Sequence, residues 1–521
     1  MAETKKKSTG MEKFIRGIEV VGNKLPHPFW LFVWLMFIVM ILSYFLSKAG
    51  VSVTYMAAKA GSDPVETTVN VSNLLSVPAM RGFFTNFIKN YINFAPLGLI
   101  MVMTLGISLI EQPGLISAFM RKTIMGAPSF LVTATLALIG INANLASDAG
   151  IIFTPAIGAA IFKALGRNPW VGIITGFAAA TGGFTANLFV AGTDGLLAGI
   201  TESVVKGTGI NAPTHILINW YFLIVATVIL TIITTFITEK FTVKLLGDNT
   251  SKKDASYLKE HEVKPEEKRG LRWAGITLLA YIAIIAVLTI PQGSFFRADD
   301  GTIVPSSPFL SSIVPILFFL FFFVGSAYGL GARTIKKAED VPKYMQKGMA
   351  GLLSFLVVAL PAAMFIQLFN DSKLTTILAV KGGQLIERLG LGGIPLIVIF
   401  VLLVSFINLF MISGSAKWLI LAPIFVPMFA QVGFSPAFTQ IAYRAGDSST
   451  NIISPLSYYL PVIIGLLEQY KPEGRQEKVG IGSVISYSLP YSLSYLVMFI
   501  LMLIIWYVFK LPLGPGTPTT L

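Results

Sequence analysis

Three charged side chains lie in a part of the chain that is otherwise apolar enough to sit in lipid. Lys417 lies in segment 413–423, and Arg444 and Asp447 lie in segment 442–455. A charge at the centre of a bilayer costs about 2.5–3.5 kcal/mol on insertion scales, so such residues usually mark a solute or ion path. Because both segments also hold several Ser, Thr and Gly residues, they predict a solute or ion site at membrane depth.

Arg444 is the best candidate to bind an anion. A guanidinium stays charged and grips a carboxylate through two parallel hydrogen bonds. The alternative is a structural ion pair with Asp447, which shares its helix face at a spacing of three residues. Trp418 either stacks on an aromatic ring of the solute or packs at an interface. Lys417 either faces water at the outer mouth or takes part in the site.

Two aspartates, Asp194 and Asp447, are candidate proton carriers, and Asp148 is a third. Asp447 lies beside Arg444, so we expect it to stay ionised unless a solute competes for the arginine. Asp194 has no cation close to it in the sequence, so we expect it to exchange a proton more easily. A rival hypothesis makes Asp194 and Asp447 the dyad of an intramembrane hydrolase, which requires the two carboxylates to share a proton.

Small neutral side chains accompany these charges in both halves of the chain. Their oxygens suit a hard cation such as Na⁺, although such residues also let helices pack closely. The neutral candidates are Asn144, Ser147, Thr185, Asn187, Ser413, Ser415, Thr450 and Asn451. We expect ion binding or coupling at Asp194, Asp447, Asn144, Ser147, Asn187 and Asn451. Pro436 and Pro455 flank the second cluster, where a missing amide donor ends or kinks a helix.

The composition indicates a polytopic helical membrane protein. Of 521 residues, 54% are hydrophobic and 12% charged, whereas a soluble domain carries about 25% charged residues. Continuous apolar runs of about 20 residues favour helices over a β-barrel. The net charge of +13 comes mostly from loops, which is the positive-inside pattern of membrane proteins rather than a nucleic-acid site.

Several chemistries have no support in the sequence. The chain has no cysteine, and His27, His215 and His261 show no metal-ligand spacing, so we expect no metal other than Na⁺ and no cofactor. A phosphate-binding Gly-x-x-x-x-Gly-Lys loop is also absent, so ATP is not expected to drive the protein directly.

The apolar runs predict an order of spans, hairpins and broken helices. Full spans are expected at about 28–48, 94–111, 214–238, 271–290, 307–331, 350–369 and 483–509. Re-entrant hairpins are expected at 129–165 and 394–429. Helices starting at Pro169 and Pro436 are expected to break at 181–187 and 446–451. Residues 49–82 suit an outer loop. The predicted units are 1–25 (basic arm), 26–93, 94–206 (first repeat core), 207–349 (with loop 240–272), 350–467 (second repeat core) and 468–521.

The two halves show weak internal symmetry. Asn142 matches Asn408, Ser147 matches Ser415, Pro155 matches Pro423 and Pro169 matches Pro436, at offsets of 266 to 268 residues. Repeated breaks of this kind point to a transporter site between inverted repeats. Nine spans and two hairpins place the N-terminus and the basic loops 240–272, 332–349 and 468–482 in the cytoplasm, and the C-terminus outside.

Segments 415–428 and 442–455 together resemble the AbgT (p-aminobenzoyl-glutamate transporter) family of the ion-transporter superfamily. The resemblance covers nearly the whole chain. It implies an all-α, elevator-type fold with nine spans and two hairpins, a homodimer, and the bacterial cytoplasmic membrane. Family substrates are p-aminobenzoyl-glutamate and, for some members, exported sulfonamide antimetabolites, which links the family to antibiotic resistance. Family functional positions fall on Asp194, Trp418, Pro436, Arg444, Asp447 and Pro455, with Ser415 near them.

We therefore expect a secondary active transporter of aromatic anions, and not an enzyme. Arg444 would hold a solute carboxylate and Trp418 the aromatic ring. Asp194 and Asp447 would couple transport to protons or help orient the site, with Na⁺ at the broken helices. The alternatives are a dicarboxylate or short-chain fatty-acid carrier of the same superfamily, a channel, and the hydrolase described above.

Overall fold

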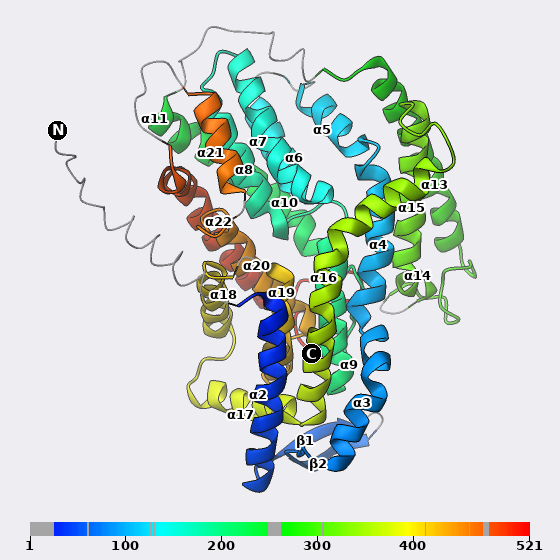
Figure 1. The fold of residues 1–521 in the computed structure, drawn as a ribbon, viewed down its shortest axis with the longest axis vertical. Helices are drawn as coiled ribbons and strands as arrows, with labels where there is room; N and C mark the ends of the chain where they lie inside the picture. The colour runs from blue at the N-terminus through cyan, green and yellow to red at the C-terminus, as the bar shows by residue number, and fades with distance from the viewer. Residues whose placement is uncertain are drawn as a thin grey trace, which may run out of the picture.

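The computed structural model describes residues 26–59, 62–125, 128, 131–247, 262–304, 307–411, 413–457, 459–471 and 479–521. The described residues are mostly helical, at 75%. The predicted basic arm at 1–25 and the middle of loop 240–272 lie outside the described residues. Figure 1 shows helices along most of the long axis, with one small hairpin of strands at the lower end.

Seven long helical stretches are apolar enough to cross a membrane in the described part of the chain. Each predicted full span coincides with one of them. They are α2 (Pro28–Lys48), α3 (Val77–Ile92) with α4 (Ala95–Glu111), α10 (Trp220–Ile237) with η4 (Thr238–Thr242) and α11 (Val243–Leu246), α13 (Pro265–Thr289), α15 (Ile313–Gly331), α16 (Asp340–Asp371) and α22 (Ile481–Phe509). The two broken helices described below would bring the count to nine, which stays a prediction.

Helical hairpins lie at both predicted places. The first consists of α6 (Val132–Ile141), a short turn η2 (Asn142–Ala146) and α7 (Ser147–Ala164), and the second of α18 (Ile394–Asn408) and α19 (Gly414–Gln431). At 1.5 Å per residue, α6 is about 15 Å long, which is half the thickness of a hydrocarbon core. Ser413 caps α19, because its side chain accepts a hydrogen bond from the amide of Ala416.

The first broken helix lies where the sequence predicts it. Helix α8 (Pro169–Gly182) ends in a short turn, η3 (Gly183–Thr185), and α9 (Gly192–Thr208) begins after a non-helical connection. The predicted break at 446–451 is wrong. Helix α20 (Pro436–Asn451) runs through it, and the chain unwinds only before α21 (Leu460–Gln469).

Two features explain why the second break comes later. The hydroxyls of Ser449 and Thr450 bond back to the carbonyl of Gly446, at 3.1 and 3.0 Å, so these polar side chains are satisfied within the helix. Pro455 lies in the actual break. Proline has no amide hydrogen and disfavours a helical residue before it.

Several elements were not predicted from the sequence. Over the expected outer loop 49–82, strands β1 (Ser52–Lys59) and β2 (Ser62–Asn70) form an antiparallel hairpin, and α3 follows. Helices α5 (Leu115–Met125), α14 (Pro308–Ser311) and α17 (Leu374–Arg388) were also missed. In Figure 1, β1, β2, α3 and α17 gather at the lower end of the molecule.

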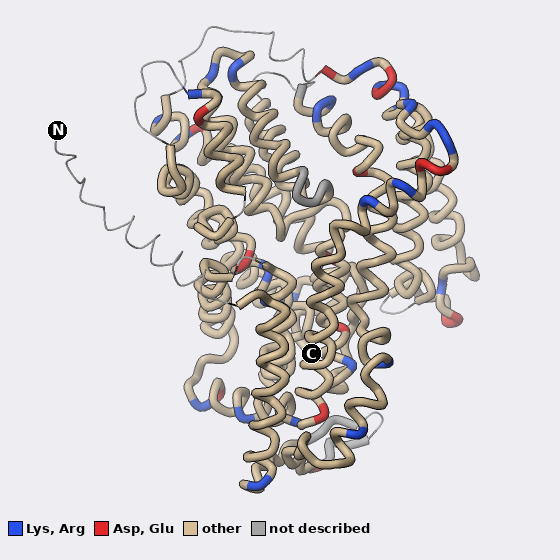
Figure 2. Tube along the Cα trace, viewed as in Figure 1, with Lys and Arg blue, Asp and Glu red and all other residues tan. Residues whose placement is uncertain are grey.

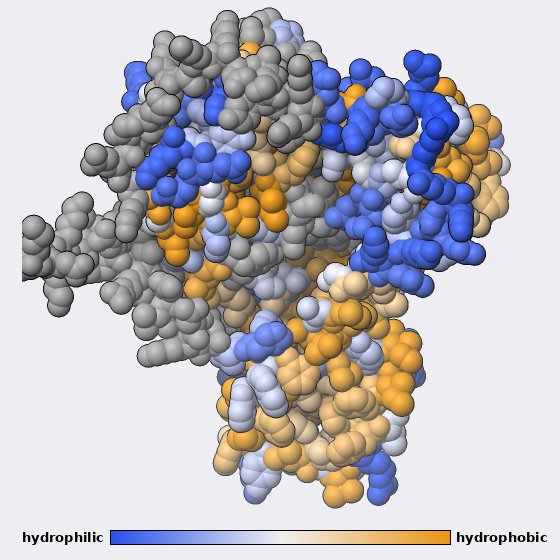
Figure 3. Space-filling view, turned by 45° about the horizontal axis from the view of Figure 1, so that its top comes forward, coloured by the Kyte–Doolittle hydropathy of each residue, from blue (hydrophilic) through white to orange (hydrophobic). Residues whose placement is uncertain are grey.

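Charge is concentrated at the ends of helices. Figure 2 shows Lys and Arg mainly along the upper edge, over the first turns of α13 and α16, with a second group on α17 at the lower end. The middles of the helices are almost free of charge. Figure 3 shows the hydrophilic surface over the starts of α13 and α16 beside orange, apolar helix surface. This division is typical of a protein whose helix middles lie in lipid.

Helices α7 and α8 approach each other through two glycines. A Cβ added at Gly172 would lie 2.2 Å from the carbonyl oxygen of Gly158, and one at Gly158 would lie 2.4 Å from that of Gly172. The first hairpin is therefore docked backbone-to-backbone on the first broken helix.

Gly172→Ala should destabilise the protein by about 1–3 kcal/mol, because overpacking forces the two backbones apart. Thermal unfolding of the purified protein in detergent measures this as a lower Tm. The matched control is Gly98→Ala in α4, where an added Cβ meets no atom within 4 Å. Equal Tm values for the two variants would contradict this account of the contact.

Candidate functional site

A cavity of about 380 Å³ lies between the two halves of the chain. The first half contributes residues from α7, α8, η3 and α9, including Thr185, Thr193 and Leu197. The second half contributes residues from the start of α19, from α20 and from the connection after it, including Ser415, Tyr443 and Arg444. The lining thus combines apolar side chains, hydroxyls and charged groups. This is the usual composition of a small-molecule site.

Arg444 and Asp194 form a buried ion pair across the two halves. Arg444 Nη1 lies 2.7 Å from Asp194 Oδ1, and each side chain is only 3% exposed. Asp194 lies in the first turn of α9, where the helix dipole favours a negative charge. Its Oδ2 accepts hydrogen bonds from the amide of Ala191 at 2.7 Å and from Asn187 Nδ2 at 3.2 Å. The carboxylate is thereby fixed as the partner of Arg444.

This pairing corrects two expectations. Arg444 does not pair with Asp447, although the two share a helix, because the guanidinium turns toward α9 and its Nη2 donates to the carbonyl of Phe184 at 3.0 Å. Asp194 does have a cation, one that is 250 residues away in sequence and brought close by the fold.

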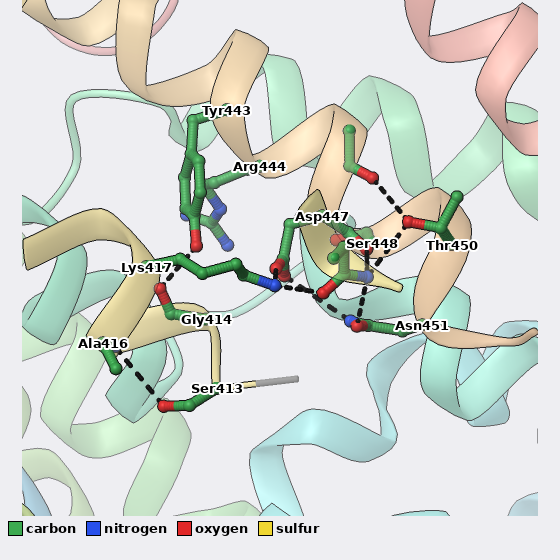
Figure 4. Close-up of polar contacts among 12 residues, drawn as sticks. Ser413, Gly414, Ala416, Lys417, Tyr443, Arg444, Asp447, Ser448, Thr450 and Asn451 are labelled. Atoms are coloured by element: carbon green, nitrogen blue, oxygen red, sulfur yellow. Dashed lines mark hydrogen bonds and ion pairs between the residues drawn. The ribbon is translucent and has the colours of Figure 1, made fainter. Parts of the chain in front are cut away.

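Lys417 and Asp447 form the second charged pair. Lys417 Nζ lies 2.5 Å from Asp447 Oδ1, and the two side chains are 0% and 11% exposed. Figure 4 shows the lysine reaching from the second hairpin toward α20. Lys417 Nζ also donates to Asn408 Oδ1. Asn408 Nδ2 in turn donates to the carbonyl of Asp447 at 2.8 Å and to Asn451 Oδ1 at 2.9 Å. The option that placed Lys417 in water at the outer mouth is therefore wrong.

Trp418 lies behind the cavity rather than in its lining. It is 0% exposed and stacks on Tyr443, with ring centroids 4.6 Å apart and planes at 24°. Its Nε1 donates to Thr201 Oγ1 at 3.0 Å. Tyr443 does line the cavity, and its hydroxyl donates to the carbonyl of Gly414. Tyr443, Phe184 and Tyr459 therefore offer aromatic surface to a solute, and Trp418 packs against Tyr443.

Trp418→Phe should keep solute affinity within about threefold, because it removes a buried donor without touching the cavity, and it should lower stability by about 1 kcal/mol. The control is Trp273→Phe, because Trp273 is 46% exposed on α13. Equilibrium binding and thermal unfolding measure both effects. A large loss of affinity at unchanged stability would show that Trp418 contacts the solute.

The remaining candidates divide into four groups. Asn144 Nδ2 donates to Asn187 Oδ1, so these amides extend the Asp194–Arg444 pair toward the first hairpin tip. Ser415 and Asn451 line the cavity. Ser147 begins α7 and Asp148 follows it, but their side chains lie outside the described set. Pro436 is the first residue of α20, and Pro455 lies in the break after that helix. Neither proline lines the cavity.

Known proteins resemble this chain over nearly its full length. Residues 13–521 match the model of the "AbgT putative transporter family". The p-aminobenzoyl-glutamate transport protein of Escherichia coli (strain K12) is 40% identical over 499 residues, which are 96% of this chain and 95% of that protein. The chain belongs to the AbgT family. It is therefore a membrane transporter.

Two solved AbgT structures have the same fold. MtrF of Neisseria gonorrhoeae, whose structure illuminates a class of antimetabolite efflux pumps, is 36% identical to this chain, with a TM-score of 0.89. The alignment covers 97% of this chain and all of MtrF. The YdaH transporter of Alcanivorax borkumensis is 35% identical with a TM-score of 0.86, over 94% of this chain and all of YdaH.

The geometry of this AbgT protein does not fit the hydrolase alternative. Asp194 binds Arg444, whereas Asp447 binds Lys417. A dyad needs two carboxylates that share one proton, and among the described residues each has its own cation instead. Groups of three or more His, Cys, Asp or Glu that could hold a metal ion are also absent from the described part of the chain.

Sequence reasoning missed some residues of the site. Tyr443 precedes Arg444, and its aromatic type beside that charge was a usable signal. Asn408 was noted only as the repeat partner of Asn142, although it bonds both Lys417 and the α20 backbone. Thr193 and Phe184 line the cavity, but nothing in their local pattern distinguishes them from packing residues.

Proposed function

We propose that this AbgT transporter is a secondary active carrier of p-aminobenzoyl-glutamate and related aromatic anions, including sulfonamide antimetabolites, driven by a proton or sodium gradient. The observation that carries the proposal is the position of the Arg444 guanidinium. This guanidinium lines the cavity between the two halves, and Asp194 is its only carboxylate partner in the described part of the chain. The E. coli relative named for this solute supports the substrate class.

The mechanism is a competition between two carboxylates for Arg444. A solute carboxylate that enters the cavity can take the guanidinium through two parallel hydrogen bonds. Asp194 would then be left as a buried charge without its cation, which is unfavourable by several kcal/mol. A coupling cation, a proton or Na⁺, restores neutrality at Asp194. Asn187 supplies a neutral amide group next to that carboxylate, and Asn144 donates to Asn187.

The Lys417–Asp447 pair has a different task in this account. It fixes the tip of the second hairpin to α20, because Lys417 lies in the first turns of α19 and its partner Asp447 lies on α20. The hairpins and broken helices would move as one unit against the remaining spans, in a homodimer with the N-terminus in the cytoplasm. Ser415, Asn451, Ser147 and the two prolines are proposed to shape this unit around solute and ion.

Transport into proteoliposomes tests the proposal. Radiolabelled p-aminobenzoyl-glutamate should accumulate under an imposed proton or Na⁺ gradient and should not accumulate when ionophores collapse that gradient. An unlabelled dicarboxylate and a short-chain fatty acid serve as competitors for the alternative carrier hypothesis. Movement that is independent of both gradients would contradict secondary transport. Competition by the small carboxylates but not by p-aminobenzoate derivatives would favour the alternative.

A further inference from the structure

A second cavity, of about 450 Å³, adjoins the first. It lies between α4 and α16 on one side and η2, η3 and α9 on the other. The two cavities share three lining residues, Phe184, Thr193 and Leu196. These three residues therefore form a partition between the two cavities.

The second cavity has one basic and one acidic side chain in its lining, and its lysine and apolar walls suit an anion with an apolar body. Ile100, Ile107 and Leu352 form apolar walls, and Lys347 on α16 brings a cation to the lining. Glu111 also lines the cavity, at the end of α4. Lys347 belongs to the basic segment 332–349, so the cavity lies toward the end of the molecule that the charge pattern places in the cytoplasm.

The partition is tied to the arginine of the first cavity. The carbonyl of Phe184 accepts the hydrogen bond from Arg444 Nη2 at 3.0 Å. The next residue, Thr185, donates from Oγ1 to the carbonyl of Arg444 at 2.8 Å. The guanidinium that would bind the solute thus also holds the backbone that carries the partition.

We propose that the second cavity is a transit subsite for the same aromatic anion, and that the Phe184 side chain gates passage between it and the first cavity. This inference rests on the proposed function for the identity of the solute. When a solute carboxylate draws Arg444 away, the carbonyl of Phe184 loses its donor. The short turn η3 is then free to move, and the ring leaves the partition.

Cysteine labelling tests the gate and the subsite separately. The chain has no cysteine, so each introduced thiol is unique. Gly351→Cys probes the second cavity, because a Cβ there meets no atom within 4 Å. Ser457→Cys probes the first cavity. Gln346→Cys, exposed on α16 and in the lining of neither cavity, is the control. An anionic methanethiosulfonate is applied to inside-out vesicles.

For the gate, Phe184→Ala should speed the labelling of Ser457→Cys by about tenfold or more. The reason is that a minor open state is populated about 0.1–10% of the time, so a permanently open passage raises the labelling rate by at least that factor. Phe189→Ala, in the connection that follows η3 and 56% exposed, should leave the labelling rate unchanged. Equal rates in these two backgrounds would overturn the gate.

For the subsite, p-aminobenzoyl-glutamate should slow labelling at Gly351→Cys and Ser457→Cys but not at Gln346→Cys. Protection at Ser457→Cys alone would overturn the subsite and leave the proposed function standing. Protection at neither position would contradict the proposed function itself, because the solute would then not occupy the first cavity.

Discussion

Arg444→Ala should lower the transport efficiency for p-aminobenzoyl-glutamate by at least about 100-fold, which corresponds to about 2.7 kcal/mol. The substitution removes the guanidinium that lines the cavity and leaves Asp194 as a buried carboxylate without its cation. Arg444→Lys should recover little, because a lysine is a point charge and cannot bind a carboxylate through a planar fork. Initial rates of radiolabelled uptake into proteoliposomes measure the effect.

A double variant separates a binding role from a folding role at Arg444. In Arg444→Leu/Asp194→Asn both charges of the pair are gone, so the buried unpaired carboxylate no longer destabilises the protein. We expect a Tm near that of the wild type with transport still absent. Arg272→Ala, at an exposed position of α13, is the control for loss of an arginine. Wild-type uptake by the stable double variant would show that Arg444 acts only in folding.

Lys417→Met should destabilise the protein by about 3–5 kcal/mol, the usual effect of removing one partner of a buried ion pair. Lys417 as a whole residue is 1% exposed, and its ammonium contacts both Asp447 and Asn408. Its loss leaves a carboxylate and an amide oxygen without their donor. Unfolding of the purified protein in detergent measures the change.

The partner substitution should reverse most of this loss. In Lys417→Met/Asp447→Asn the unpaired charge is gone, so the stability should return to within about 1–2 kcal/mol of the wild type. Lys206→Met is the control, because that lysine is 69% exposed and pairs with Glu202 on the surface, where such pairs contribute about 0–1 kcal/mol. If Lys417→Met behaved like Lys206→Met, the buried pair would not support the second hairpin.

The positions of the hairpins and of the first broken helix were predictable because they depend on local signals. Half-length apolar runs that end at small polar residues cannot cross a bilayer as single helices, and their backbone needs protein or water cover. The runs around 142–146 and 183–185 carry such signals, and the structure has turns there. The later break after α20 was mislocated, because hydroxyl-rich residues 446–451 are also compatible with a helix when their side chains bond within it.

The charge pairing was not predictable, because it depends on contacts between distant segments. Arg444 had a plausible partner three residues away, yet the fold brings Asp194 to it across 250 positions. Lys417 looked suited to water by its type, yet Asp447 and Asn408 satisfy it in the interior. Which residues carry charge was evident from the sequence, while their partners required the packing of α9, α19 and α20 around one cavity.

Proton uptake on solute binding tests the central claim that a solute carboxylate displaces Asp194 from Arg444. The purified protein in weakly buffered detergent solution is mixed with p-aminobenzoyl-glutamate while an indicator dye follows the pH, with Na⁺ absent. The wild type should take up about one proton per solute bound, because the released Asp194 carboxylate then becomes the site of protonation. Asp194→Asn should bind solute with almost no uptake. Equal uptake by both proteins would contradict the competition between the two carboxylates. Solute binding by the wild type with neither proton uptake nor a requirement for Na⁺ would contradict it as well.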